Sequence, residues 1–187
     1  LKYTYTASEI QPDMLNADIT KTTDSPSWGG LYLQYFEKFD QVQQQKGILS
    51  VTKKLFIEKI GSDGKQELLP LGKEKLKTGD KVITRLTLSL KQDMDFLYLK
   101  DFRAACFEPI GQLSGNQWKF GTVYYEESKD AVTNFFFNSL AKGTYVLEYP
   151  VWVNQAGTYQ DGIATFQSMY APEYTAYSEA GKITVTK

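Results

Sequence analysis

Histidine is absent from this sequence of 187 residues, and cysteine occurs once. The lack of histidine excludes Ser-His-Asp and Cys-His catalysis and removes the commonest protein ligand for zinc, copper and iron. The single thiol, Cys106, excludes an internal disulfide and a thiolate metal cluster. Because Cys106 lies between Ala105 and Phe107, it is interpreted as a small buried apolar residue. The sequence predicts no cofactor and no metal site.

Long apolar runs and an excess of charge are also missing. No stretch approaches the ~20 apolar residues that cross a bilayer, so no transmembrane segment is expected, and no signal peptide opens the chain. The formal net charge of −1 provides no basic surface, so nucleic acid is not an expected partner. The chain begins with Leu1 rather than Met, and we expect it to be a fragment of a longer protein whose targeting signals lie elsewhere.

Reactive side chains are few and poorly placed for catalysis. The stretch CFEP begins like the Cys-x-Glu-Gln of an internal thioester, but Pro109 stands where the acyl-donating Gln is needed. Asp93 and Asp95 lie in a turn-like stretch, and Glu126 and Glu127 would face opposite sides of a strand. Neither pair fits the two facing acids that glycoside hydrolysis requires. The chain is therefore not expected to be an enzyme.

Alternating apolar residues dominate from residue 48 onward. In VITRLTLSL, residues 82–90, one face is apolar apart from a single Thr, which is the period of a half-buried strand. GTYVLEYPVWV, residues 143–153, alternates likewise, and Pro150 indicates an edge strand or a bulge. The other predicted strands cover residues 48–60, 94–106, 121–128, 133–140, 157–170 and 182–187. Because turn-forming residues separate these segments, the sequence predicts an all-β fold, an antiparallel β-sandwich.

The first 46 residues differ from the rest. KYTYT, ADITKT and WGGLYLQYF are plausible strands, but they are too few to bury a core. The stretch EKFDQVQQQKG that follows is polar and rich in Gln, which is typical of a linker. We expect residues 1–46 to be the remnant of a preceding β domain plus this linker, and residues 47–187 to form the sandwich. The alternative is that the early strands pack back onto the sandwich as an extension.

Aromatic side chains are the strongest sign of a binding function. The chain has 13 Tyr, 11 Phe and 3 Trp. Such rings could form a flat stacking surface for a carbohydrate or another ligand, or they could line sheet edges and contacts with other domains. The candidates for exposed aromatic contacts are Trp118, Tyr124 and Tyr174, with Trp28, Tyr125, Trp152 and Tyr177 as further possibilities.

Several stretches resemble the C-terminal part of bacterial alpha-2-macroglobulin-like proteins, especially the large forms of Bacteroides-type bacteria. The resemblance covers residues 28–187 and is strongest in TNFFF, LAKGTYV and SMYAPE. It implies that residues 47–187 are the last macroglobulin-type, Ig-like sandwich of a multidomain chain. Residues 1–46 would then be the tail of a CUB-like β domain.

The resemblance also implies a function. Such proteins are protease traps of the cell envelope: a protease cuts a bait segment, the domains rearrange, and a thioester acylates the attacker. The last domain packs on the thioester domain, where a Met-Tyr pair shields the bond from water. In SMYAP this role falls on Met169 and Tyr170. A Met beside a Tyr would form an adaptable apolar plug with one polar group.

The expected partners follow from the same resemblance. They are the neighbouring domains of the same polypeptide, above all the thioester domain, and target proteases reached through the whole protein. The expected location is the cell envelope of a Gram-negative bacterium, in the periplasm or at the outer membrane.

Overall fold

The computed structural model describes residues 2–16, 18–72, 75–111, 113–119 and 121–187. The chain divides into two compact units, Leu1–Phe36 and Glu37–Lys187. The first unit contains a short 3-10 helix, η1 (Pro12–Leu15), and no strand among its described residues. The three strands predicted in this part are therefore wrong for this chain. A strand needs a partner to satisfy its backbone N–H and C=O groups, and these segments have none here. That residues 1–46 come from a preceding domain stays a prediction.

The segment 37–46, predicted as part of a linker, belongs to the second unit. The side-chain amide of Gln44 donates a hydrogen bond of 2.6 Å to the carbonyl oxygen of Val51. The backbone N–H of Gln45 donates one of 3.0 Å to the carbonyl oxygen of Tyr177. The Gln-rich composition suggested a solvated linker, but these polar groups bond to the backbone of the sandwich.

The second unit is built from strands. Neither 3-10 helix of the described chain has the length and apolar character needed to span a bilayer. The elements are η2 (Phe39–Gln41), β1 (Leu49–Ile60), β2 (Gln66–Pro70), β3 (Leu76–Lys77), β4 (Lys81–Leu90), β5 (Met94–Phe102), β6 (Phe107–Pro109), β7 (Gly115–Lys119), β8 (Thr122–Ser128), β9 (Val132–Leu140), β10 (Gly143–Val153), β11 (Gly157–Asp161), β12 (Ala164–Ser168), β13 (Thr175–Tyr177) and β14 (Gly181–Thr186).

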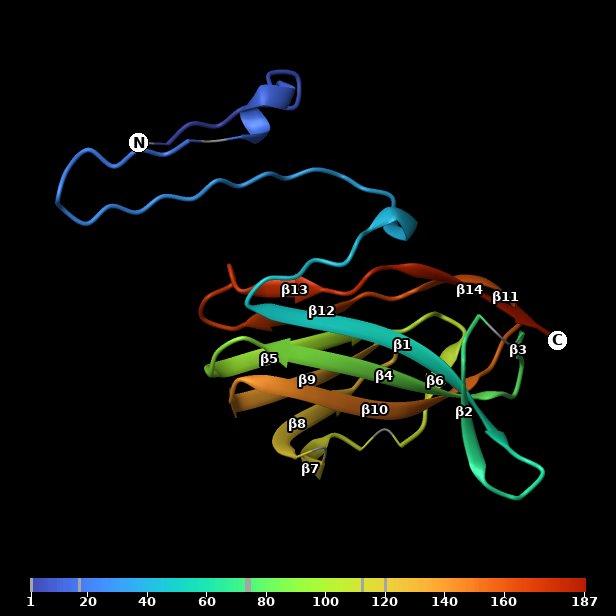
Figure 1. Cartoon of the computed structure of the whole chain (residues 1–187). Coiled ribbons are helices and arrows are strands. Elements are labelled where there is room, and N and C mark those ends of the chain that lie inside the picture. Colours follow the sequence, from blue (N-terminus) through green and yellow to red (C-terminus); the bar gives the residue numbers. More distant parts are fainter. Residues whose placement is uncertain (1, 17, 73–74, 112, 120) are drawn as a thin grey trace. The chain divides into compact units, whose positions relative to one another are not determined.

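The strands form two larger sheets and one small one (Figure 1). The five-stranded sheet has the order β2-β1-β4-β10-β6, and the six-stranded sheet has the order β13-β12-β5-β9-β8-β7. The small sheet has the order β11-β14-β3, and its β14–β3 pair is parallel while the other pairs are antiparallel. The predicted all-β antiparallel sandwich is confirmed.

The core lies between the inner faces of the two larger sheets. In β4 every second residue from Val82 to Leu90 turns inward and is at most 2% exposed. The alternation predicted for this strand is therefore confirmed, and burial of these side chains drives the packing of the sheets. The largest fully buried side chains are Phe135, Phe137, Phe166, Leu49, Ile57, Leu76, Leu86, Leu88, Leu97, Leu99, Leu147 and Val51.

The single strand predicted over residues 157–170 is two strands in different sheets. β11 pairs with β14, and β12 pairs with β5. The chain passes from one sheet to the other next to Gly162, where a Cβ atom would lie 2.0 Å from the carbonyl oxygen of Phe102. A glycine is needed here because the two backbones are in contact.

Pro150 lies next to the part of β10 that has a partner strand on both sides. β10 pairs with β4 along its length, but it pairs with the three-residue β6 only at residues 151–153. In the described part of the chain, residues 143–149 have no partner strand on that side. Pro150 lies where the pairing with β6 begins, and its carbonyl oxygen accepts a hydrogen bond of 3.3 Å from the N–H of Ile110. Because Pro150 has no backbone N–H, its place next to the unpaired edge costs the sheet few hydrogen bonds.

Candidate functional site

The Met-Tyr pair lies just after β12, beside Phe96 of β5. The N–H of Met169 donates a hydrogen bond of 2.9 Å to the carbonyl oxygen of Phe96. The rings of Tyr170 and Phe96 meet edge to face with 5.2 Å between centroids. The side chains are exposed, Met169 to 43%, Tyr170 to 79% and Phe96 to 48%. These three residues are called the rim.

The turn that follows the rim is closed by hydrogen bonds. The N–H of Ser168 donates to the carbonyl oxygen of Tyr174 at 3.1 Å, and the N–H of Tyr174 donates to that of Ala171 at 2.9 Å. The hydroxyl of Ser168 accepts a bond of 3.3 Å from the N–H of Ala171. Because Ser168 is buried and belongs to β12, the turn holds Met169 and Tyr170 in a defined place on the sheet.

Phe96 has a strained backbone. Its φ angle is 52°, in the left-handed region that favours glycine. Its neighbours Asp95 and Leu97 keep their register with β9, so the strand continues through the strained residue. A left-handed conformation costs a bulky residue roughly 1–2 kcal/mol. Strain of this kind concentrates at functional sites, and here it coincides with exposed apolar side chains.

Phe96→Gly is expected to change the free energy of unfolding by less than about 1 kcal/mol, because relief of the strain offsets the lost contact of a half-exposed ring. The matched control is Phe102→Gly on the same strand, where φ is ordinary and the ring is 40% exposed. Phe102→Gly should lower the free energy of unfolding, measured in urea, by about 1 kcal/mol more than Phe96→Gly does. Equal losses in the two variants would show that Phe96 stores no strain.

The other predicted aromatic contacts have different surroundings. Trp118 on β7 is 84% exposed, and Tyr174 is half-buried against the core. Tyr124 is only 3% exposed, so its prediction as an exposed contact is wrong. Its ring packs on Phe135 and Phe137, each with centroids 5.7 Å apart. Two adjacent tyrosines in a strand point to opposite faces, and the pattern did not show which one turns inward.

A row of rings crosses the outer face of the six-stranded sheet. Tyr98, Phe136 and Tyr125 are cross-strand neighbours on β5, β9 and β8. The first two stack on one another at 5.1 Å with an interplanar angle of 25°, and the third is tilted by 51° at 6.2 Å. A platform for a sugar needs ring faces turned to solvent, whereas the Tyr98 and Phe136 faces meet each other. This row does not favour the carbohydrate-binding alternative.

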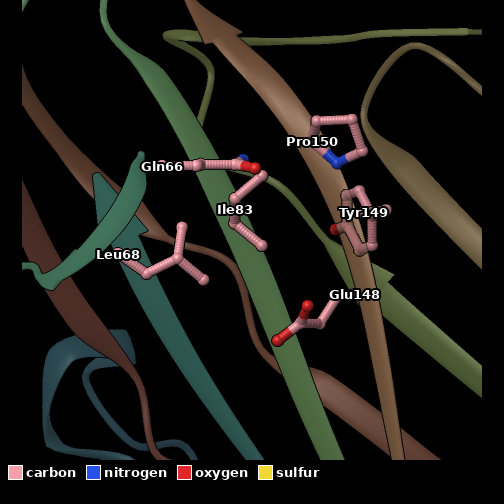
Figure 2. A pocket seen from close by; sticks show the side chains of 6 residues that line it. All are labelled: Gln66, Leu68, Ile83, Glu148, Tyr149 and Pro150. Atoms are coloured by element: carbon pink, nitrogen blue, oxygen red, sulfur yellow. The ribbon is translucent and has the colours of Figure 1, made fainter. Parts of the chain in front are cut away.

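A groove of about 360 Å³ lies on the five-stranded sheet (Figure 2). Ile83 and Pro150, which are neighbours in the register, form its apolar floor, with Gln66 and Leu68 of β2 beside them. Glu148 supplies the one carboxylate of the described lining, and it forms an ion pair with Arg85. A single neutralised acid cannot perform the two-acid chemistry of a glycosidase.

A buried charge cluster joins the three sheets and was missed by the sequence analysis. The ammonium of Lys53 on β1 lies 3.0 Å from a carboxylate oxygen of Asp101 and 2.9 Å from one of Asp161. It also donates to the carbonyl oxygens of Phe102, at 2.7 Å, and Gly162, at 2.8 Å. The ammonium of Lys53 is therefore bound by two pairs of consecutive residues. In each pair, Asp101–Phe102 and Asp161–Gly162, the Asp supplies a carboxylate and the next residue supplies its backbone carbonyl.

The cluster is deeply buried and electrostatically coupled. The side chains of Lys53 and Asp101 are 3% and 0% exposed, and that of Asp161 is 18% exposed. Burial by itself lowers the pKa of Lys53, but the charges of the two carboxylates outweigh it and raise the pKa overall. Burial raises the pKa of Asp161 despite the opposing charge of Lys53. The hydroxyl of Tyr149 donates a hydrogen bond to the second oxygen of Asp101.

A signal for this cluster was present in the sequence. Lys53 occupies an inward position in the alternation of β1, and Asp101 occupies one in β5, each among buried apolar neighbours. A charge at a core position is rarely left unpaired, because desolvation makes it costly. The partner could not be read from the pattern, since Lys53 and Gly162 are separated by 109 positions.

The other reactive side chains have structural surroundings. Cys106 is buried, as predicted, and burial raises the pKa of its thiol to about 11. Asp93 accepts a hydrogen bond of 2.7 Å from the N–H of Lys142, and Glu127 accepts one of 2.8 Å from Asn134. The described residues contain no group of three His, Cys, Asp or Glu side chains that could hold a metal ion.

Comparison with known proteins assigns this sandwich. Residues 49–173, more than half of the chain, match the sequence model of a family described as the bacterial alpha-2-macroglobulin MG10 domain. The chain belongs to this family. The MG10 match begins at the first residue of β1 and ends in the turn after the rim.

Solved structures support the fold of this MG10 domain. Salmonella alpha-2-macroglobulin reacted with methylamine is 20% identical, with a TM-score of 0.60 over 78% of this chain and 10% of that one. Trypsin-activated alpha-2-macroglobulin from Escherichia coli is 17% identical, with a TM-score of 0.58 over 78% and 11%. The native conformation of the E. coli protein is 18% identical, with a TM-score of 0.58 over 83% and 10%. The chain thus spans about a tenth of these proteins. No curated protein matches it by sequence.

Proposed function

We propose that this MG10 domain is a non-enzymatic docking module of a longer alpha-2-macroglobulin-like polypeptide, and that its rim covers the thioester of a neighbouring domain. The observation that carries the proposal is the exposure of Phe96, Met169 and Tyr170 at one place, on a turn closed by hydrogen bonds. Exposed apolar side chains in a fixed arrangement are suited to contact with another protein surface.

The chemistry of the rim suits the exclusion of water. A thioester survives only where water is kept from its carbonyl carbon. The thioether of Met169 adapts to an irregular surface, and the ring of Tyr170 adds a large apolar face with one hydroxyl. The Phe96 ring packs against the edge of the Tyr170 ring, so the rim already has its arrangement before the thioester domain binds.

The wider role that we propose is that of a protease trap in the cell envelope, periplasmic or at the outer membrane. Support comes from the related proteins, one solved after reaction with methylamine and another after activation by trypsin. Reaction with an amine and activation by a protease are the two properties that a thioester trap requires. Target proteases would meet the whole protein, and this module would contact the domains beside it.

Tyr170→Ala in the full-length protein is expected to speed the methylamine-driven release of the thioester thiol by about tenfold, which corresponds to roughly 1.4 kcal/mol of lost shielding. The loss is reasonable for an aromatic contact at an interface. The measurement is the rate at which a free thiol appears, followed with a chromogenic disulfide.

The matched control is Trp118→Ala, which removes an exposed ring from β7, at the far end of the six-stranded sheet from β12. It should leave the rate unchanged. Equal rates for Tyr170→Ala and the unmodified protein would remove the shielding role. Absence of a Cys-x-Glu-Gln motif from the full-length protein would remove the thioester as the partner.

A further inference from the structure

The Lys53 cluster places an amine against a carboxylate inside a β-sandwich, with a second carboxylate beside both. We propose that Lys53 and Asp101 condense to an amide, an intramolecular isopeptide bond, with Asp161 as the proton carrier. The bond would join β1 of the five-stranded sheet to β5 of the six-stranded sheet. This inference concerns the inside of the domain and does not depend on the docking role of the rim.

The amine of Lys53 and the carboxylate of Asp101 are held close together before the reaction. Nζ of Lys53 lies 3.0 Å from Oδ1 of Asp101, one C–O bond away from the carbon that would be attacked. The carbonyls of Phe102 and Gly162 fix the position of the nitrogen. Both side chains are almost fully buried, so neither has freedom to leave. Holding two groups in this way removes most of the entropic barrier to their combination.

Asp101 is the better acyl group, and Asp161 the better proton carrier. The second oxygen of Asp101 accepts the hydrogen bond of Tyr149, which would stabilise negative charge on that oxygen during attack. Tyr149 is buried and its pKa is raised by burial, so its hydroxyl stays protonated as a donor. Asp161 is partly exposed and its pKa is raised by burial, which suits a carboxylate that must take up and return a proton.

The step balances without any other reactant. A proton passes from the ammonium of Lys53 to the carboxylate of Asp101, leaving a neutral amine and a neutral acid. The amine nitrogen bonds to the carboxyl carbon, and the C=O electron pair moves onto the oxygen that faces Tyr149. Asp161 takes a proton from nitrogen and delivers it to the hydroxyl oxygen. The C–O bond then breaks, water leaves with the bonding pair, and the carbonyl reforms.

The product water has a route to solvent. Lys53 and Asp161 both line a groove of about 490 Å³ that also includes Lys182 and Gly181 at the start of β14. Condensation would replace one buried positive and one buried negative charge by a neutral amide, which removes their desolvation cost and leaves the charge of the more exposed Asp161. Loss of water to bulk solvent would make the product persist inside the folded domain.

Intact mass spectrometry of the purified 187-residue chain under denaturing conditions tests the proposal. The expected mass is lower than that of the sequence by one water molecule. A protease digest should contain one branched peptide that joins the segments around Lys53 and Asp101. Asp161→Ala should fold and keep the full mass, because the proton carrier is lost. A wild-type chain of full mass, unchanged after prolonged warming below its unfolding temperature, would overturn the proposal.

A second source of the same mass loss needs its own control. Asp161 precedes Gly162, and an Asp-Gly pair can lose water by forming a succinimide within the backbone. Lys53→Arg keeps the positive charge but removes the amine that forms the bond. The mass loss should vanish in this variant. Persistence of the loss in Lys53→Arg, with no branched peptide in the wild type, would assign it to Asp161 and reject the isopeptide bond.

Discussion

Gly162→Ala is expected to lower the free energy of unfolding by about 3 kcal/mol or more, or to prevent folding altogether. The added Cβ would lie 2.0 Å from the carbonyl oxygen of Phe102 and 2.5 Å from its Cβ. The obstacle is mainly backbone, so no side-chain rotation can relieve it. Any shift would also separate the two carbonyls that bind Lys53, because Phe102 and Gly162 supply both of them. The measurement is urea unfolding followed by tryptophan fluorescence.

The matched control is Gly181→Ala, at the position that pairs with Asp161 in the small sheet. A Cβ at Gly181 meets nothing within 4 Å, and its φ is not in the left-handed region. This variant should keep its stability to within about 0.5 kcal/mol. If both variants unfold at the same urea concentration, the close contact between the 102 and 162 backbones does not exist in solution.

Lys53→Met is expected to cost about 3–5 kcal/mol relative to the chain before Lys53 condenses with Asp101, because it leaves the carboxylates of Asp101 and Asp161 buried without a cation. The methionine side chain retains most of the apolar volume of the lysine stem, so the loss measures charge rather than packing. The control is Lys54→Met, one residue further on the opposite face of β1, where the side chain is exposed. That variant should change stability by less than about 0.5 kcal/mol. Similar losses for the two lysines would contradict a buried cluster.

The pH dependence of the same variant has a definite sign. Without Lys53, Asp161 loses the nearby positive charge that lowers its pKa, so the pKa of Asp161 rises further and the deficit should shrink as the pH falls from neutral towards 4. In the wild type, Asp161 already has a pKa above its ordinary value of 3.8. Its contribution therefore favours folding at a pH below that value and is lost as the pH rises through the raised pKa.

Local patterns were enough to place most strands, since the face that each side chain takes follows from alternation alone. β4, β9 and β10 lie where their apolar periods predict. The same patterns did not assign Tyr124 to the core, because Tyr124 and Tyr125 offer the same aromatic character to either face of β8. They also did not show that the chain changes sheets next to Gly162, although the less exposed positions shift there from Tyr159 and Asp161 to Ala164 and Phe166.

The sequence by itself determined an all-β sandwich, the absence of histidine chemistry and the position of a Met-Tyr pair at the end of a strand. Only the tertiary structure decided that Phe96 lies beside that pair in a strained conformation, and that Lys53 meets Asp101 and Asp161. The physical reason is that strand formation depends on the period of neighbouring side chains, which is local. A charge cluster depends on which strands become neighbours, and that is settled by the joint packing of sheets whose contacting residues lie far apart in the chain.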